Sequence, residues 1–278
     1  MNSRKAAFRC GRFDFDLSRP LIMGIVNTTP DSFSDGGRYV DLDAAMRRVD
    51  AMIADGADII DIGGESTRPF APPVSLDEEL DRTIPLLEKL RDHGVPLSVD
   101  TYKPAVMAAA LAAGADMIND IWALRQPGAI EAIRDSNCGL CVMHMHGEPE
   151  SMQNRSFVDD VVAEVTNFLE RRVDTLLKSG IQTERICVDP GFGFGKSVEQ
   201  NYALLKHLEL TRVGYPLLAG VSRKSMLRKK TGRTPQDCLS SSVTAAVIAV
   251  ERGAAIVRVH DVAETRDALS ILEALQAA

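Results

Sequence analysis

The stretch Gly56-Ala57-Asp58-Ile59-Ile60-Asp61 combines a helix-ending glycine, a short apolar strand and a polar residue at the end of that strand. The same phrase returns as GADMIN at 114–119 and, in looser form, as GAAIVR at 253–258. Residues 96–100 and 185–189 repeat its strand half, because each ends an apolar run with aspartate. A unit that recurs in this way predicts a fold built from repeated strands and helices.

Further apolar runs bring the expected strands to eight. In chain order they lie near residues 22, 59, 97, 117, 141, 187, 217 and 256. Amphipathic segments fit helices between them, at 42–54, 76–90, 161–177 and 243–251. Apolar strands joined by helices form parallel sheets that the helices cover. Eight such units predict an α/β protein with a single (β/α)₈ TIM barrel, and a doubly wound open sheet is the alternative.

The composition fits one globular domain. The chain has 278 residues with 45% hydrophobic and 26% charged content, and no Pro/Ser-rich linker or charge block divides it. We predict a single domain over 1–278, with an N-terminal extension of about residues 1–18 before the first barrel strand. The formal net charge of −7 argues against a nucleic-acid partner. No apolar run has the length of a membrane span or the pattern of a signal peptide, which predicts a cytoplasmic protein without a membrane partner.

The five cysteines are scattered along the chain, and their odd number fits reduced thiols better than a disulfide framework. Cys138 and Cys141 form the one pair with redox-like or metal-like spacing. Because no second CxxC accompanies them, we interpret both as buried structural thiols.

In such a barrel the C-terminal ends of all strands open on one face, where active sites are built. Most of the expected strands end in a polar residue. These residues are Asn27, Asp61, Asp100, Asn119, Asp189 and Arg258. Any one of them could simply shape a loop or cap a helix. Together they indicate a functional site, because a purely structural protein has no reason to gather unpaired polar groups.

Two early loops carry candidate ligand groups. In the first, Asn27, Asp31 and Asp35 offer hard oxygen atoms, which suit Mg²⁺ when a substrate phosphate completes its shell. In the second, at 61–69, glycines allow close backbone approach and Arg68 could pair with a carboxylate.

Two later loops suggest a flat ligand and an anion. Residues 189–197, DPGFGFGKS, are not a Walker phosphate loop, because a proline stands at the first required glycine. We interpret Asp189 as the functional group of this loop and the glycines as room for a flat ligand. Lys224, Arg258 and His260 follow the seventh and eighth expected strands, where barrels of this type often bind phosphate. In an acidic protein they predict a local anion site.

Eight motifs together resemble the dihydropteroate synthases, in that family's order and over nearly the whole chain. The motifs are NTTPDSFSDGG, DIGGESTRP, SVDT, NDI, MHM, DPGFGFGK, SRKS and RVHDV. The resemblance implies a transferase of folate synthesis that condenses 6-hydroxymethyl-7,8-dihydropterin pyrophosphate with p-aminobenzoate, giving 7,8-dihydropteroate and pyrophosphate. It also implies a homodimer, and a member of the enzyme class that sulfonamides target.

The resemblance further assigns residues to each ligand. The groups implied to hold the pterin are Asp100, Asn119, Asp189 and Lys224. Those implied at the pyrophosphate or beside it are Thr67, Arg258 and His260, with Asn27 for Mg²⁺. From the oxygen ligands of the first loop we add Asp35 as a second Mg²⁺ ligand. Those implied to line the p-aminobenzoate pocket are Pro69, Phe194, Lys224 and Ser225, with Phe33 and Arg68 on the neighbouring loops. Phe70 departs from the family, which usually has glycine there.

The amine of p-aminobenzoate is a weak nucleophile, so we expect pyrophosphate to leave first and no covalent enzyme nucleophile to be needed. We also expect p-aminobenzoate to bind productively only after the pterin substrate. The two early loops have little apolar content, and bound Mg²⁺ and pyrophosphate would supply the free energy that orders them.

Three other functions remain as alternatives. A pterin-dependent methyltransferase would use the same aspartates but has no use for an anion site at Lys224, Arg258 and His260. A metal hydrolase could use His144 and His146, although such barrels usually need a further histidine at other strand ends. A pterin-binding protein without catalysis is the alternative from another class.

Overall fold

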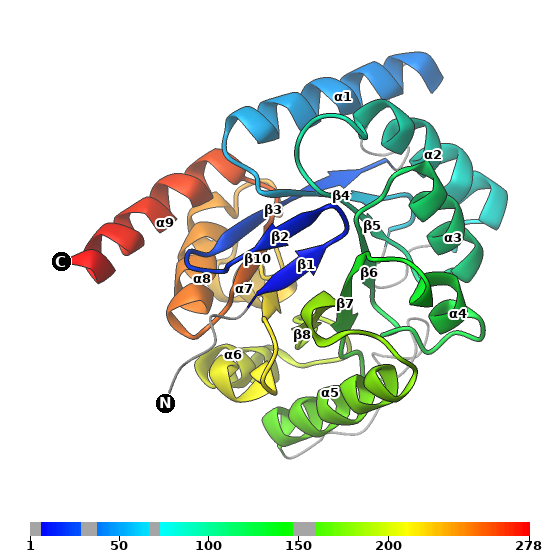
Figure 1. The fold of residues 1–278 in the computed structure, drawn as a ribbon. Helices are drawn as coiled ribbons and strands as arrows, with labels where there is room; N and C mark the ends of the chain where they lie inside the picture. The colour runs from blue at the N-terminus through cyan, green and yellow to red at the C-terminus, as the bar shows by residue number, and fades with distance from the viewer. Residues whose placement is uncertain (1–6, 29–37, 67–72, 147–159) are drawn as a thin grey trace.

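The computed structural model describes residues 7–28, 38–66, 73–146 and 160–278, and of 38–41 it describes the backbone alone. Eight parallel strands form a barrel (Figure 1). They are β3 Leu21–Asn27, β4 Ile59–Gly63, β5 Leu97–Asp100, β6 Met117–Asp120, β7 Gly139–Met143, β8 Ile186–Asp189, β9 Leu218–Ala219 and β10 Ile256–Val259. The sheet order is β8-β7-β6-β5-β4-β3-β10-β9, and a bridge between Val188 and Leu217 joins its two ends. The predicted barrel is confirmed, and each expected strand position lies in one of these strands or beside it.

Helices surround this barrel (Figure 1). They are α1 Arg38–Ala54, α2 Leu76–Leu90, α3 Pro104–Ala113, α4 Ala129–Arg134, α5 Val161–Lys178, α6 Val198–Lys206, α7 Ser225–Thr231, α8 Leu239–Glu251 and α9 Val262–Ala277. Short 3₁₀ helices at Thr183–Arg185 and Leu208–Arg212 precede β8 and β9. α2 has the predicted bounds, whereas α8 begins before residue 243 because the serines at 240–242 interrupt the apolar pattern but not the helix. None of the helices described here is long and apolar enough to cross a membrane.

Alternation along each strand separates an outer and an inner apolar layer. On β7, Leu140 and Val142 pack outward under the helices, whereas Cys141 packs inside the barrel. Cys138 belongs to the outer layer, so the two cysteines of the CxxC pair lie on opposite sides of the barrel wall. All five cysteines are free, as predicted, and Cys138 and Cys141 are both buried, as their interpretation as buried thiols requires.

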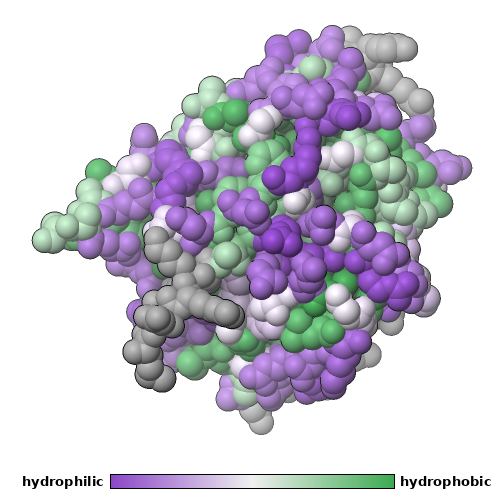
Figure 2. Space-filling model, viewed as in Figure 1, coloured by the Kyte–Doolittle hydropathy of each residue, from purple (hydrophilic) through white to green (hydrophobic). Residues whose placement is uncertain are grey.

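The N-terminal extension contains a β-hairpin that the sequence did not predict, formed by β1 Phe8–Cys10 and β2 Phe13–Phe15. The first and last side chains of β1 are fully buried in the inner layer of the barrel, and Arg9 between them is partly exposed. A Cβ on Gly139, at the start of β7, would stand 3.0 Å from the carbonyl oxygen of Arg9. The hairpin therefore closes the N-terminal end of the barrel (Figure 1). In the same view, hydrophilic residues and hydrophobic residues alternate across the middle of this face (Figure 2).

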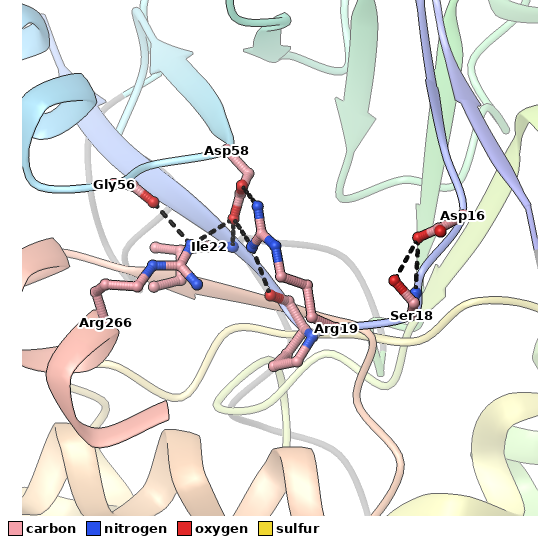
Figure 3. A network of polar contacts seen from close by, with 8 residues as sticks. Asp16, Ser18, Arg19, Ile22, Gly56, Asp58 and Arg266 are labelled. Carbon is pink, nitrogen blue, oxygen red and sulfur yellow. Dashed lines mark hydrogen bonds and ion pairs between the residues drawn. The ribbon is translucent and has the colours of Figure 1, made fainter. Parts of the chain in front are cut away.

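Asp58, the aspartate of the repeated phrase, stabilises the junction between α1 and β4 at the N-terminal end of the barrel. Asp58 accepts a 2.8 Å hydrogen bond from the backbone N–H of Ile22 on the neighbouring strand β3. The same carboxylate pairs with Arg19, which precedes β3, and with Arg266 of α9 (Figure 3). One carboxylate thereby joins three segments that are distant in the sequence.

Asp116 makes equivalent contacts in the second copy of the phrase. Its carboxylate accepts from the backbone N–H of Leu97 at 3.2 Å and from Nε of Arg12 at 2.8 Å. In the third copy Ala255 replaces the aspartate, and its backbone oxygen accepts from the N–H of Leu21 at 2.8 Å. The repeated aspartate thus has a structural role, distinct from that of the polar residue that ends each strand.

Candidate active site

Polar side chains from four strands meet inside the C-terminal end of the barrel. Arg258 on β10 donates from Nε to Oδ2 of Asp61 at 2.6 Å and from Nη2 to Oδ2 of Asp100 at 2.9 Å. Asn119 on β6 donates to the same oxygen of Asp61 at 3.2 Å. Parallel register aligns Asp100 with Asn119, and the period of two along each strand turns these side chains inward. The predicted convergence of polar strand ends is therefore present.

This network leaves carboxylate oxygens without partners. Oδ1 of Asp61 and Oδ1 of Asp100 are buried and accept no hydrogen bond from the residues that the structure describes. Burial raises the pKa of Asp100 to about 7, although the positive charge of Arg258 acts in the opposite direction. A buried acceptor without a donor costs about 1 to 3 kcal/mol. Both oxygens therefore suit a ligand that brings N–H donors.

Asp189 is the last residue of β8, at the same C-terminal end of the barrel as Asp100. Its Oδ1 accepts a 2.7 Å hydrogen bond from the backbone N–H of Gly191, and burial raises its pKa. A Cβ on Gly220 would stand 4.0 Å from Oδ2 of Asp189 and 3.9 Å from the Cβ of Arg258. Because both side chains border this one glycine, Asp189 lies next to the Arg258 network.

Phe194 and Lys224 lie beside Asp189. Nζ of Lys224 stands 4.3 Å from the centre of the Phe194 ring, within cation–π range. Phe194 packs in a small apolar cluster with Met143 and Met145. Lys224 directly precedes α7, whose first residue is Ser225. The structure therefore brings together Phe194 and Lys224, two of the residues that the resemblance assigned to one pocket, and Ser225 follows Lys224 in the chain.

His260 lies among basic side chains. Its Nδ1 is 3.0 Å from Oγ of Ser222, and burial lowers its pKa to about 3, an effect that the nearby cations Arg223 and Arg258 reinforce. Arg223 is held by Asp261 at 2.5 Å. Sequence reasoning named Arg258 and His260 but missed Arg223, although Arg223 stands inside the SRKS motif.

Asn27, the expected Mg²⁺ ligand, ends β3. A Cβ on Gly63 would stand 3.7 Å from Oδ1 of Asn27 and 3.8 Å from the Cβ of Asp100, so the amide oxygen lies at the rim of the site. An amide oxygen is a hard ligand of the kind that Mg²⁺ accepts. The described ranges contain no group of three or more His, Cys, Asp or Glu side chains that could hold a metal. Asp35, the second expected ligand, lies outside those ranges.

The site lies within a segment that matches a known family. Residues 23–260 match the family model described as pterin binding enzyme. The dihydropteroate synthase of Haemophilus influenzae is 48% identical over 261 residues, which cover 93% of this chain and 95% of that protein. The chain belongs to the dihydropteroate synthase family.

Solved structures of dihydropteroate synthases share the fold. The Burkholderia cenocepacia enzyme complexed with 7,8-dihydropteroate has a TM-score of 0.91 and 59% identity, over 98% of this chain and 97% of that one. The Xanthomonas albilineans enzyme with 4-aminobenzoic acid has a TM-score of 0.92 and 49% identity, over 99% of each chain. The Yersinia pestis enzyme in a sulfonamide complex has a TM-score of 0.92 and 46% identity, over 98% of this chain and 100% of that one.

Lys103 contacts described residues on both sides of the range 67–72. The predicted residues of the two early loops that fall outside the described part of the chain are Asp31, Phe33, Ser34, Asp35, Thr67, Arg68, Pro69 and Phe70. Nζ of Lys103 pairs with Glu65 and donates to the backbone oxygen of Val74 at 2.8 Å, and these two residues lie on either side of the range 67–72. Glu79 of α2, almost fully buried, binds the same ammonium group at 2.5 Å. Sequence reasoning missed this cluster, because nothing in the local pattern links Lys103 to a loop formed earlier in the chain.

His144 and His146, the histidines considered for a metal hydrolase, both contact Glu164 at the start of α5. Nδ1 of His146 is 2.8 Å from Oε1 of Glu164, and Nε2 of His144 is 3.6 Å from the same oxygen. Burial lowers the pKa of His144 to about 4, and the contact with His144 lowers the pKa of Glu164 to about 2. In this synthase-family chain the two histidines thus join the end of β7 to a helix.

Proposed function

We propose that this chain uses the site around Asp100 to condense a pterin pyrophosphate with p-aminobenzoate. As a member of the dihydropteroate synthase family it is a transferase, and its product is 7,8-dihydropteroate. One observation supports placing the pterin here: Oδ1 of Asp100 is buried inside the C-terminal end of the barrel and accepts no hydrogen bond from a described residue. A flat ligand with N–H donors along one edge would satisfy that oxygen.

The pterin edge presents its donors in a row, like a guanidine. The carboxylates of Asp100 and Asp189 would accept them, and the amide of Asn119 can both donate and accept. Arg258 opposes the effect of burial on Asp100 and so favours the ionised carboxylate that the donors need. We infer that Arg258 supports the pterin site as well as the anion site assigned to it from the sequence.

Loss of pyrophosphate places positive charge on the pterin methylene carbon and negative charge on the leaving group. The carboxylates would stabilise the first charge, and Lys224 and Arg223 the second. His260 is neutral at neutral pH, since its pKa is about 3, and it could take up a proton as the anion arrives. The amine of p-aminobenzoate then forms the carbon–nitrogen bond and loses a proton.

Phe194, Lys224 and Ser225 would form the pocket for p-aminobenzoate. The Phe194 ring offers a face for the aromatic ring, and Lys224 offers a cation for the carboxylate. The bound 4-aminobenzoic acid in the Xanthomonas albilineans relative supports a ligand of this kind.

Mg²⁺ is the cofactor that we propose, with Asn27 and, outside the described residues, Asp35 as its ligands. When bound, the ion would neutralise charge on the pyrophosphate. Its presence would also help to order the early loops, so that p-aminobenzoate binds second. Calorimetry of p-aminobenzoate, with and without a pterin plus pyrophosphate and Mg²⁺, tests both proposals. Equal affinity for the free protein would exclude the proposed order.

The decisive experiment measures pyrophosphate release and formation of 7,8-dihydropteroate with both substrates, and with each substrate alone. We expect release only when both are present. Pterin binding without release would indicate a non-catalytic binding protein, and transfer of a methyl group would indicate the methyltransferase. Asp100→Asn provides the matched control, because it keeps the shape of the side chain and removes its charge. We expect this variant to release less pyrophosphate than the unsubstituted protein.

A homodimer is the assembly that we propose. Large apolar side chains are exposed on the neighbouring helices α8 and α9, namely Leu239, Ile248, Ile271 and Leu275. Covering them in a second copy would remove apolar surface from water. Light scattering after size exclusion tests the assembly, and a monomer would contradict it. The cytoplasmic location predicted from the sequence stays a proposal that cell fractionation can test.

A further inference from the structure

Lys196 is a lysine that the proposed chemistry does not use. Its ammonium group donates to three backbone oxygens, those of Gly191 at 2.8 Å, Phe194 at 3.2 Å and His144 at 3.3 Å. Three carbonyl groups around one ammonium group satisfy all three of its N–H donors. Because all three acceptors are backbone oxygens, the ammonium group of Lys196 fixes the backbone of these segments and pairs with no described side chain at hydrogen-bond distance.

The three acceptors belong to two segments that pass very close to each other. His144 follows β7, whereas Gly191 and Phe194 follow β8. A Cβ on Gly191, whose φ is +70°, would stand 1.9 Å from the carbonyl oxygen of His144, so that position accepts only glycine. Lys196 therefore bridges two strand ends, and the second of these carries Asp189.

We propose that Lys196 is a positioning residue for the p-aminobenzoate pocket, because its ammonium group holds the backbone that carries Phe194 against the end of β7. The inference rests on the proposed function, which places p-aminobenzoate beside Phe194. The bridge fixes the Phe194 ring where Nζ of Lys224 stands over it. Lys196 itself would touch no substrate.

The bridge depends on the protonation of Lys196. A neutral amine has two N–H donors and a lone pair, so it cannot donate to three carbonyl groups. Its lone pair would face one of the oxygens, and the longer contacts to Phe194 and His144 would be lost before that to Gly191. Deprotonation would therefore loosen the backbone that carries the Phe194 ring.

Several charged groups face this ammonium group. Burial lowers the pKa of Lys196 to about 7, the carboxylates of Asp189 and Glu164 oppose that change, and Lys224 adds to it. His144 also faces Lys196, which lowers the pKa of the imidazole. Since the protonated form makes the third hydrogen bond, the bridge weakens as the pH rises through neutrality.

Steady-state kinetics at saturating pterin substrate tests the proposal. In the unsubstituted protein, the KM for p-aminobenzoate should rise about 2- to 12-fold from about pH 6 to about pH 9, the effect expected for one lost hydrogen bond. In Lys196→Met the KM should be high throughout and independent of pH. The carboxyl and amino groups of p-aminobenzoate titrate below this range and do not contribute. A KM that is independent of pH in the unsubstituted protein would overturn the proposal.

Asn201→Leu is the matched control. Asn201 holds the same loop from α6, since its Oδ1 accepts from the N–H of Gly193 at 2.7 Å and its Nδ2 donates to the backbone oxygen of Lys196 at 3.1 Å. This variant should raise the KM for p-aminobenzoate and keep its pH dependence. A pH dependence that disappears in Asn201→Leu as well would show that loop packing, not the Lys196 charge, is responsible.

A readout without turnover separates this proposal from the proposed function. Lysine side-chain NMR of the free protein, assigned with Lys196→Arg, should show Lys196 titrating near neutrality, and an ordinary titration at about pH 10 would contradict the bridge's pH dependence. The NMR titration still tests the protonation of Lys196 if the Lys196→Met variant does not fold. Failure to form 7,8-dihydropteroate would contradict the proposed function, while the NMR titration would still test the bridge.

Discussion

Asp61 and Arg258 stand 197 residues apart in the chain, and Nε of Arg258 donates a 2.6 Å hydrogen bond to Oδ2 of Asp61 inside the barrel. Arg258→Met would leave the fully buried Asp61 without its cation. We expect the free energy of unfolding to fall by about 3 to 5 kcal/mol, as for other broken buried pairs, measured by urea titration near neutral pH. Adding Asp61→Asn to this variant should restore part of the loss. A single variant as stable as the original would show that the pair does not stabilise the fold.

Asp100 should make pterin affinity depend on pH. Its pKa is raised to about 7 in the free protein, and we expect the bound pterin to favour the ionised carboxylate. Binding below pH 7 then requires loss of a proton, so affinity should fall by up to about tenfold for each pH unit below that point. Calorimetry of a pterin over this range provides the measurement. Asp100→Asn should give weaker binding without this dependence, and the same slope in that variant would assign the titration to another group.

Asp189→Asn should weaken pterin binding by about 10- to 150-fold, the effect of losing a charge-assisted hydrogen bond. The amide can still accept from the N–H of Gly191, so the loop after β8 should keep its conformation. Titration calorimetry checks the affinity, and thermal unfolding checks the fold. Unchanged pterin affinity in a folded variant would remove Asp189 from the site.

The sequence predicted the barrel because its strands are short apolar runs, several of which follow helix-ending glycines. Asp189 ends β8 as predicted, whereas Asp61 lies two residues before the end of β4. The sequence could not predict the partners of Arg258, since a cation near the C-terminal end of the eighth strand can pair with an anion or with a carboxylate equally well. The hairpin at residues 8–15 was not predicted, because strands of three residues are too short to show a pattern and are stable only when they pack on the barrel interior. The role of Lys103 was not predicted, because its partners Glu65 and Glu79 lie on other elements, far from it in the sequence.

His260 should bind a proton when the pyrophosphate binds. It is neutral in the free protein, since burial and neighbouring cations lower its pKa to about 3, and a bound anion would raise that value. In calorimetry of the pterin pyrophosphate in buffers of different ionisation enthalpy, His260→Ala should therefore take up fewer protons, or release more, than the unsubstituted protein, while the contribution of Asp100 stays the same in both. The same variant should impair turnover more than it impairs binding of the pterin alcohol, which lacks pyrophosphate. Equal losses for both compounds would assign His260 to the ring or to the fold.

Lys103→Met should destabilise the protein and raise the KM for p-aminobenzoate. Glu65 and Glu79 would lose the cation that they share, and Glu65 and Val74, on either side of the range 67–72, would lose the side chain that links them. We expect the free energy of unfolding to fall by about 3 to 5 kcal/mol, measured by urea titration. Adding Glu79→Gln should recover stability but not the KM. If the double variant recovered both, Lys103 would act on stability alone.

The hairpin that closes one end of the barrel also determines where a fusion partner or a solid support can be linked without blocking the active site. Residue 7 leads into β1 at the closed end, whereas Asp100 and Asp189 open at the other end. A fusion partner, an affinity label or a solid support joined to the amino terminus would therefore meet the molecule on the side away from its substrates. Immobilisation by that terminus should leave the reaction mouth facing free solution, which suits the chain to surface-based screening of compounds that compete with p-aminobenzoate.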